Sequence, residues 1–383
     1  MIKFLILIPT FFLPKTNSEI KRSSVEKNNA ANRTGKLQLQ DGTVLTGKVF
    51  GFPKSTAGEV VFNTGMVGYP ETFTDPSYCG QILTMTFPLI GNYGIPVLEK
   101  DKSPFHNFES DKAQLQALIV SEVSEEYDHW NSEQSLSSWL YKNEVPALSG
   151  IDTRKLTKIL RESGTMLGKI IIDGDVDFYD PDKDDLISKV TIKEVQRIGS
   201  GKKKVLLIDC GCKNSIAKCV AERNVEVIRV PWNYNIDELE FDAVLFSNGP
   251  GNPDMYKELV NKAKKILEME KPTLGICLGH QIMALASGLK TEKLKYGHRS
   301  QNQPVQEKNS NKCFVTSQNH GFHVVTDKLP DGWNVWFENL NDGTNEGLKH
   351  NLLPFMSVQF HPEAAPGPVD TAFIFDEFIR MIK

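Results

Sequence analysis

The second half of the chain alternates short apolar runs with amphipathic stretches. Apolar runs begin at Val205, Val225, Ala243 and Pro272, and they alternate with segments in which apolar residues recur at helical spacing. This alternation is typical of a parallel sheet flanked by helices. The pattern therefore predicts an α/β domain over residues 205–383 with a mostly parallel sheet.

The first half of the chain carries weaker periodic signals. Asp41 and Gly42 separate two segments of alternating polarity, which predicts a β-hairpin. Asp152 is a good N-cap for a helix that begins near Thr153. We predict that residues 36–195 form a mixed α/β domain with β-hairpins.

A linker is predicted between these two domains at residues 196–204. Residues 199–201, Gly-Ser-Gly, favour a boundary, and Lys202, Lys203 and Lys204 then lead into the apolar run. The net charge of −4 at pH 7 gives no electrostatic case for a nucleic-acid partner, so the lysines are interpreted as a linker end. A chain of 383 residues is long enough for two ordinary domains.

Residues 1–35 differ in character from the rest. Residues 4–13 are apolar but broken by Pro9, and they are too short to span a bilayer, so no membrane partner is predicted. The stretch up to Ser18 lacks acidic residues, which favours an organellar transit peptide over a secretory signal with a small-residue cleavage site. A disordered extension and a misassigned start codon are the alternatives. We expect a mitochondrial location, with a cytoplasmic one as the alternative.

One cysteine lies in a glycine-flanked turn between a predicted strand and a predicted helix. Residues 275–281 read Gly-Ile-Cys-Leu-Gly-His-Gln, and helically spaced apolar residues follow. Glycines two positions before and after Cys277 permit a tight turn, as in the Gly-x-Ser-x-Gly nucleophile elbow. The start of the following helix would favour a thiolate. Cys277 is therefore a candidate nucleophile, and the alternative is a buried structural cysteine.

A candidate base lies near the C-terminus. His361 and Glu363 follow the apolar strand predicted at residues 355–360, and side chains two apart in an extended chain point the same way. Pro362 between them restrains the backbone. A carboxylate on one ring nitrogen leaves the other free to accept a thiol proton. An isolated His-x-Glu is more often a strand end with a solvated glutamate, but Cys277 favours the catalytic interpretation.

Two further segments are candidates for a pocket wall. Residues 247–253, Ser-Asn-Gly-Pro-Gly-Asn-Pro, follow an apolar strand and expose N–H groups suited to an oxyanion hole, although an ordinary strand-to-helix turn would look similar. Residues 318–322, Gln-Asn-His-Gly-Phe, form either a pocket loop or a polar turn. His280 is interpreted as a helix-start residue.

Cysteine spacing and glycine motifs predict neither a metal site nor a cofactor in this chain. Cys210 and Cys212 have no second pair at zinc-site spacing, and the six cysteines suggest no disulfide framework. No segment matches the phosphate loop Gly-x-x-x-x-Gly-Lys-Ser/Thr.

Taken together, residues 247–253, 275–281, 318–322 and 359–363 resemble, in this order, the class I (triad) glutamine amidotransferases. This resemblance implies that Cys277, His361 and Glu363 form a triad that hydrolyses the side-chain amide of glutamine. It also implies that glutamine contacts fall on Gly249, Gly251, Leu278, Gln281, Asn319, Gly321 and Phe322.

Four N-terminal segments are similar to the small (glutaminase) subunit of carbamoyl phosphate synthetase. They are residues 60–71, 74–78, 90–94 and 150–157. The resemblance implies that Ser77 also touches glutamine, and that the ammonia passes to a large synthetase subunit or fused domain. That partner is expected to use ATP, with Mg, and bicarbonate for pyrimidine or arginine and urea synthesis. The alternatives are an amidotransferase for another synthetase and a catalytically silent regulatory subunit.

The chain also departs from its relatives. One animal branch of the family uses free ammonia and has serine in place of the nucleophile, whereas Cys277 is retained here. Residues 164–181 look closest to the mitochondrial arginine- and urea-linked branch, but residues 65–70 and 313–319 resemble the pyrimidine branch. Ser300 stands where relatives usually have glycine, which predicts a changed loop without a lost function.

Overall fold

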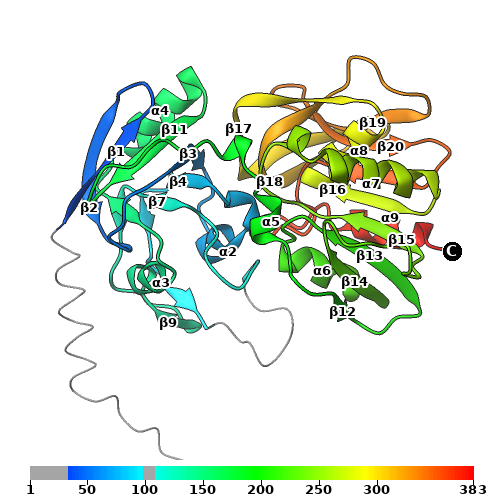
Figure 1. The fold of residues 1–383 in the computed structure, drawn as a ribbon, viewed down its shortest axis with the longest axis horizontal. Helices are drawn as coiled ribbons and strands as arrows, with labels where there is room; N and C mark the ends of the chain where they lie inside the picture. Colours follow the sequence, from blue (N-terminus) through cyan, green and yellow to red (C-terminus); the bar gives the residue numbers. More distant parts are fainter. Residues whose placement is uncertain (1–32, 98–107) are drawn as a thin grey trace, which may run out of the picture.

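The computed structural model describes residues 33–97 and 108–383. They form two lobes that lie side by side, with the N-terminal lobe on the left of Figure 1 and the C-terminal lobe on the right. The predicted extension, residues 1–35, lies almost wholly outside the described residues. Within the described residues, no helix has both the length and the apolar character needed to cross a membrane.

The N-terminal lobe is built on a closed barrel with the strand order β1-β11-β3-β4-β7-β10-β2. The hairpin predicted at Asp41 and Gly42 is present between β1 and β2, because Gly42 adopts a φ of 90° and Asp41 accepts a 2.8 Å hydrogen bond from the Thr43 N–H. The barrel strands are β1 (Thr34–Leu39), β2 (Val44–Val49), β3 (Thr56–Asn63), β4 (Gln81–Met85), β7 (Ala117–Ile119), β10 (Ala147–Ser149) and β11 (Met166–Ile171).

Helices cover the barrel. Asp152 caps α4 by accepting a 2.8 Å hydrogen bond from the Lys155 N–H, as predicted. Leu156 and Leu160 of α4 pack into the barrel core. The helices of this lobe are α2 (Tyr69–Thr74), α3 (Leu136–Lys142) and α4 (Thr153–Ser163), and its short elements are η1 (Pro76–Tyr78), β5 (Leu89–Ile90), β6 (Ile95–Pro96), β8 (Glu122–Val123) and β9 (Ser132–Gln134).

The C-terminal lobe contains a ten-stranded sheet with the order β12-β14-β13-β15-β16-β21-β20-β19-β17-β18. Its strands are β12 (Gln196–Ile198), β13 (Lys203–Asp209), β14 (Val225–Pro231), β15 (Ala243–Phe246), β16 (Thr273–Ile276), β17 (Lys290–Glu307), β18 (Cys313–Val325), β19 (Trp333–Asn339), β20 (Asn345–His350) and β21 (Phe355–Val358).

Helices pack on both faces of this sheet, which confirms the predicted α/β class. One apolar core joins the sheet to α7 and α8, and a second core on the other face joins it to α6 and α9. The helices of this part of the chain are η2 (Pro181–Lys183), α5 (Ile187–Val190), α6 (Asn214–Ala221), η3 (Pro253–Met255), α7 (Lys257–Glu268), α8 (Leu278–Ala286) and α9 (Phe373–Met381).

The sheet is parallel only in its centre, so the prediction of a mostly parallel sheet was right for the central strands and wrong for the strands at both sides. Only the five central strands, β14, β13, β15, β16 and β21, pair in parallel. The strands β20, β19, β17 and β18 extend the sheet antiparallel, and β12 pairs antiparallel at the other edge. The long strands β17 and β18 mix exposed and buried residues, so they lack the continuous apolar run that marks a strand buried on both faces.

The segment predicted as a linker, residues 196–204, is largely part of the C-terminal sheet. Strand β12 pairs with β14, and the lysines at 203 and 204 begin β13. Ile187 of the preceding helix α5 already belongs to the core of the C-terminal lobe. The polar residues at 196 and 197 lie on the exposed edge strand β12, a position at which charged side chains are common, whereas Lys203 and Lys204 begin the inner strand β13.

Candidate active site

Cys277 occupies a strained turn between β16 and α8. Its φ of 53° and ψ of −104° place it outside the regions that L-residues usually adopt. A Cβ on Gly275 would lie 2.6 Å from the Gly279 carbonyl oxygen, and one on Gly279 would lie 2.2 Å from the Phe246 carbonyl oxygen. Both glycines are therefore required for the close approach of these backbones. The predicted order of strand, turn and helix is confirmed.

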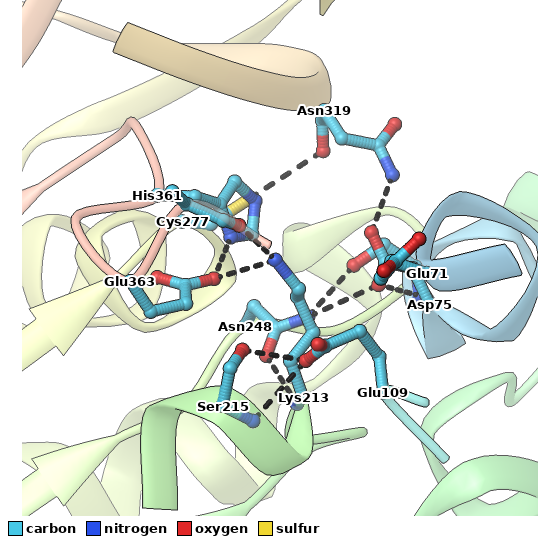
Figure 2. A network of polar contacts seen from close by, with 12 residues as sticks. Glu71, Asp75, Glu109, Lys213, Ser215, Asn248, Cys277, Asn319, His361 and Glu363 are labelled. Atoms are coloured by element: carbon cyan, nitrogen blue, oxygen red, sulfur yellow. Dashed lines mark hydrogen bonds and ion pairs between the residues drawn. The ribbon is translucent and has the colours of Figure 1, made fainter. Parts of the chain in front are cut away.

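His361 lies beside Cys277 because their strands are neighbours. Strands β16 and β21 are paired in parallel, so the residues that follow them emerge at the same sheet edge. The backbone N–H of His361 donates a 2.9 Å hydrogen bond to the Ser317 carbonyl oxygen, which fixes the base on the sheet. Figure 2 shows the sulfur of Cys277 next to the imidazole ring.

Glu363 orients the imidazole. Its Oε1 lies 2.7 Å from Nδ1 of His361, and both side chains are buried. The Nε2 atom of His361 has no hydrogen-bond partner among the described residues. Burial would lower the pKa of His361, but the charges of Glu363 and Cys277 outweigh it and raise that pKa to about 10. The imidazole of His361 is therefore in its doubly protonated, positively charged form at neutral pH.

A buried lysine that sequence reasoning missed supports this carboxylate. The Nζ of Lys213 donates to Glu363 Oε1 at 2.9 Å and to the Ala364 carbonyl oxygen at 2.7 Å (Figure 2). Burial would raise the pKa of Glu363, but Lys213 and then His361 lower it to about 2. Lys213 follows the Cys210-Gly-Cys212 segment, and a single lysine has no spacing that would mark it as buried.

Glu109 is a second buried acid near this lysine. Its Oε2 accepts hydrogen bonds from the hydroxyl of Ser215 at 2.5 Å and from the N–H of the same residue at 3.2 Å. Burial raises the pKa of Glu109 to about 7, although Lys213 opposes the shift. This carboxyl group therefore titrates near neutral pH.

The raised pKa of Glu109 predicts a pH-dependent stability. The folded state binds a proton that the unfolded state, with a pKa near 4.5, releases, so the free energy of unfolding should fall as pH rises from about 4.5 to 7. Glu109→Gln should remove this pH-dependent loss of stability, which amounts to about 3 kcal/mol for the difference between the two pKa values. Urea unfolding of both proteins between pH 5 and 8 measures it, with Glu125→Gln as an exposed control. Parallel curves for wild type and Glu109→Gln would contradict the assignment.

One pocket gathers the nucleophile and nearly all of the residues that the resemblance assigned to glutamine. Cys277 lines it, and Leu278 does not, because the Leu278 side chain packs in the core above the sheet. The predicted residues that line the pocket are Ser77, Gly249, Gly251, Gln281, Asn319, Gly321 and Phe322.

Ser77 reaches the pocket from the N-terminal lobe. Its hydroxyl accepts a 2.9 Å hydrogen bond from Asn248, which lies in the turn after β15. Asn319 of β18 likewise donates a 2.9 Å hydrogen bond to Asp75, beside Ser77. Two lobes therefore build one site, and the polar contacts between them hold its walls together.

Hydrogen bonds also fix the opposite wall. Gln281 donates from Nε2 to the Phe322 carbonyl oxygen at 2.9 Å and to Gln359 Oε1 at 3.0 Å. The thiol of Cys277 lies 3.7 Å from the Asn319 carbonyl oxygen. The segment at residues 318–322, predicted as a loop or turn, is instead part of strand β18.

A charged cluster that the sequence did not reveal closes the pocket between the lobes. Lys293 of β17 contacts Glu59 of the barrel at 2.6 Å and Asp182 at 2.5 Å. Arg299 also lines the pocket. Burial would raise the pKa of Glu59, but Lys293 and Arg299 lower it. Because each partner is far away in the sequence, no local motif could have shown this cluster.

The remaining histidines near the site have other surroundings. His280 is buried in α8 with its Nδ1 2.9 Å from the Ser357 hydroxyl, and burial lowers its pKa to about 3, which suits a neutral helix-start residue as predicted. His320 lines the pocket, and burial followed by the charge of His298 holds its pKa well below the usual value. His298, His320 and Glu346 form a group of metal-ligating type.

Ser300 does not lie in a loop, contrary to the prediction. It is buried in β17 opposite Gln318, next to a register shift between the long strands β17 and β18. An irregularity of this kind bends and twists a strand locally without ending it.

Comparison with known proteins then identifies the family. The model for "Glutamine amidotransferase class-I" matches residues 206–381, and that for "Carbamoyl-phosphate synthase small chain, CPSase domain" matches residues 37–170. The carbamoyl phosphate synthase arginine-specific small chain of Debaryomyces hansenii is 44% identical over 91% of this chain and 85% of its own length. The chain belongs to the carbamoyl-phosphate synthase small chain family.

Longer relatives match as well. The mitochondrial carbamoyl-phosphate synthase [ammonia] of Mus musculus is 45% identical over 96% of this chain and 25% of its own length. The multifunctional protein CAD of Squalus acanthias is 48% identical over 91% of this chain and 16% of its own length. The chain thus spans about a quarter or less of these curated relatives.

Proposed function

We propose that this chain is the glutaminase component of a glutamine-dependent carbamoyl phosphate synthetase. The observation that carries the proposal is the placement of Cys277, in a strained elbow, beside an imidazole that Glu363 orients. The pocket at this thiol is lined by all the residues that the resemblance assigned to glutamine except Leu278. An amidotransferase for another synthetase is disfavoured by the match of residues 37–170 to the small chain family.

The proposed reaction starts with attack of the Cys277 thiolate on the glutamine side-chain carbonyl carbon, which forms a C–S bond. We propose that the backbone N–H groups of Leu278 and Gly251 hold the developing oxyanion. His361, protonated at neutral pH, gives its proton to the departing ammonia as the C–N bond breaks. The same imidazole then takes a proton from water, which cleaves the γ-glutamyl thioester and releases glutamate.

Ammonia released at this site is useful only if a second active site receives it. We propose that the receiving partner is a large synthetase subunit or fused domain that uses ATP, with Mg, and bicarbonate. The support is the family of the chain and the length of its two longer relatives, of which it spans a quarter or less. The printed name of the Debaryomyces hansenii relative supports arginine synthesis. Pyrimidine synthesis stays within the proposal because residues 65–70 and 313–319 resemble that branch.

A direct assay tests the glutaminase function. The purified chain should release glutamate and ammonia from glutamine in equal amounts, slowly alone and faster with a synthetase subunit. Mass spectrometry of protein quenched during turnover should show a γ-glutamyl adduct on the peptide that contains Cys277. Absence of both glutamate and adduct, with a synthetase subunit present that is active with free ammonia, would favour the silent regulatory subunit.

We also propose a mitochondrial location for this protein. A mitochondrial address is supported by the residues before Ser18, which lie outside the described part of the chain, and by the mitochondrial relative in mouse. A fluorescent fusion to residues 1–35 would follow a mitochondrial marker if this is right and stay diffuse in the cytoplasm if the alternative holds.

A further inference from the structure

A second cluster of ionisable side chains lies in the antiparallel part of the C-terminal sheet. His298, His320 and Glu346 come from β17, β18 and β20, and one ligand-type atom from each lies within 4.8 Å of the other two. All three side chains are buried, and the carboxylate of Glu346 is fully so. Their residue types, two imidazoles and one carboxylate, are those that bind zinc and related metals.

One nitrogen of each imidazole is held by an oxygen acceptor outside the cluster; we call it the outer nitrogen, and the other ring nitrogen the inner nitrogen. Nε2 of His298 lies 2.8 Å from the carboxylate of Asp342, and Nδ1 of His320 lies 2.8 Å from the Phe322 carbonyl oxygen. Each acceptor is an oxygen, so in a singly protonated ring each of these nitrogens would carry the proton and the other ring nitrogen would keep a lone pair. Histidines that bind metals are usually oriented in this way by a carboxylate or a backbone carbonyl.

The inner atoms lack proper hydrogen bonds. Nδ1 of His298 and Oε2 of Glu346 are buried without a hydrogen-bond partner among the described residues, and Nδ1 lies 3.5 Å from the other carboxylate oxygen of Glu346. Nε2 of His320 faces Oε1 of Gln318 at 3.1 Å. In the neutral ring these are two acceptors, so this contact satisfies neither. Unpaired buried polar atoms are costly, and each requires an explanation.

We propose that His298, His320 and Glu346 bind a divalent transition-metal ion, with Zn²⁺ as the best match. The lone pairs of the two inner nitrogens and the free oxygen of Glu346 would supply three ligands, and Oε1 of Gln318 or a water would supply the fourth. A tetrahedral zinc site has ligand atoms about 3.3 Å apart, from bonds of about 2.0–2.1 Å. The ligand atoms of the present cluster lie within 4.8 Å of one another, so side-chain movements that shorten these separations by up to about 1.5 Å would bring the cluster to that size.

A metal ion here would join three strands at the pocket wall. His320 stands between Asn319 and Gly321, both of which line the pocket beside Cys277. The ion would therefore fix the strand that forms this wall, and it would raise the stability of the folded chain by RT ln(1 + c/Kd), where c is the concentration of the free ion. Cysteine spacing could not have revealed this site, because its ligands are spread over three strands and contain no cysteine.

A metal-free arrangement of the same residues is the rival explanation. Without an ion, His298 could carry protons on both nitrogens and pair with Asp342 and Glu346, whose charges outweigh burial and raise its pKa to about 9. The second proton would occupy the lone pair that the metal needs, so the two arrangements exclude each other and can be told apart.

The experiment uses the full chain with the substitution Cys277→Ser, which removes the thiol of the proposed triad as a competing ligand. After dialysis against a chelator, the protein is titrated with Zn²⁺ by calorimetry and with Co²⁺ by visible absorption. We expect one equivalent of each ion, an intense absorption typical of tetrahedral Co²⁺, and a higher Tm with Zn²⁺. Glu346→Gln and His298→Asn should each weaken binding by at least about a hundredfold. His129→Asn, at an exposed position, is the control.

Several results would overturn the proposal. They are the absence of saturable binding, equal affinity in the two variants and the control, and an NMR spectrum in which His298 stays doubly protonated while Zn²⁺ is present. If the buried variants fail to fold, Asp342→Asn provides the same test, since its side chain is 39% exposed. That variant should keep the fold and bind Zn²⁺ about tenfold more weakly, because it no longer orients His298.

Discussion

Cys277→Ser should reduce glutamate release from glutamine by at least about a thousandfold. Serine places a slightly smaller side chain at this buried position, but its hydroxyl does not ionise to an anion near neutral pH. The imidazole of His361 holds a proton at neutral pH, so it is poorly suited to activate a hydroxyl as a base. The loss should appear in kcat, measured by enzymatic detection of glutamate.

A matched control separates this effect from unfolding. Cys313→Ser changes an exposed cysteine at the start of β18 and should leave glutamate release unchanged. Both variants should show the Tm of the wild type, because in each of them a hydroxyl replaces the thiol and can still donate to the carbonyl oxygen that the thiol faces. If Cys277→Ser retained more than about a tenth of the wild-type rate, Cys277 would not be the nucleophile, and the elbow would be a structural turn.

The site could be predicted from the sequence as far as it depends on local geometry. The elbow at Cys277 and the pair His361 and Glu363 each lie within a few residues, so glycine spacing and strand alternation were sufficient to indicate them. The parallel pairing of β16 and β21 then brings the two segments together. The apolar runs predicted a parallel sheet, but they did not predict which two strands are neighbours in it.

Other parts of the site could not be predicted, because they depend on long-range packing. Lys213 lies 150 residues from its partner Glu363, and Lys293 contacts Glu59 across the two lobes. The sequence around each lysine is that of an ordinary polar segment. The antiparallel strands β17 and β18 were missed for a related reason. They are stabilised by pairing with each other over most of their length, and neither contains a local apolar run that would have marked it as a strand.

The buried charges around the triad alternate in sign. Protonated His361 lies next to ionised Glu363, which in turn contacts the ammonium of Lys213, and Glu109 lies beyond it (Figure 2). Each charge offsets the cost of burying its neighbour, so the set is stable only as a whole. Burial alone would lower the pKa of Lys213, but Glu363 and then Glu109 raise it above its ordinary value. Removing one member should therefore disturb the protonation of the others.

Lys213→Met should destabilise the fold by about 3–5 kcal/mol, because it leaves the buried carboxylate of Glu363 without its ammonium partner. In the wild type the lowered pKa of Glu363 adds stability above pH 4.5, and that stability is lost as pH falls toward about 2. Without the positive charge of Lys213 the pKa of Glu363 should rise, so this loss should begin at higher pH. Urea unfolding between pH 3 and 8 measures the shift.

The same substitution should change catalysis in a way that destabilisation alone does not. A protonated Glu363 no longer holds the imidazolium form of His361, so the acidic limb of the kcat/KM profile should move toward neutral pH. Lys213→Arg keeps the positive charge and should restore the position of that limb, even if its larger side chain costs some stability. Lys202→Met, at an exposed position, is the surface control. An acidic limb that coincides in the wild type and in Lys213→Met would show that this lysine does not act on the triad.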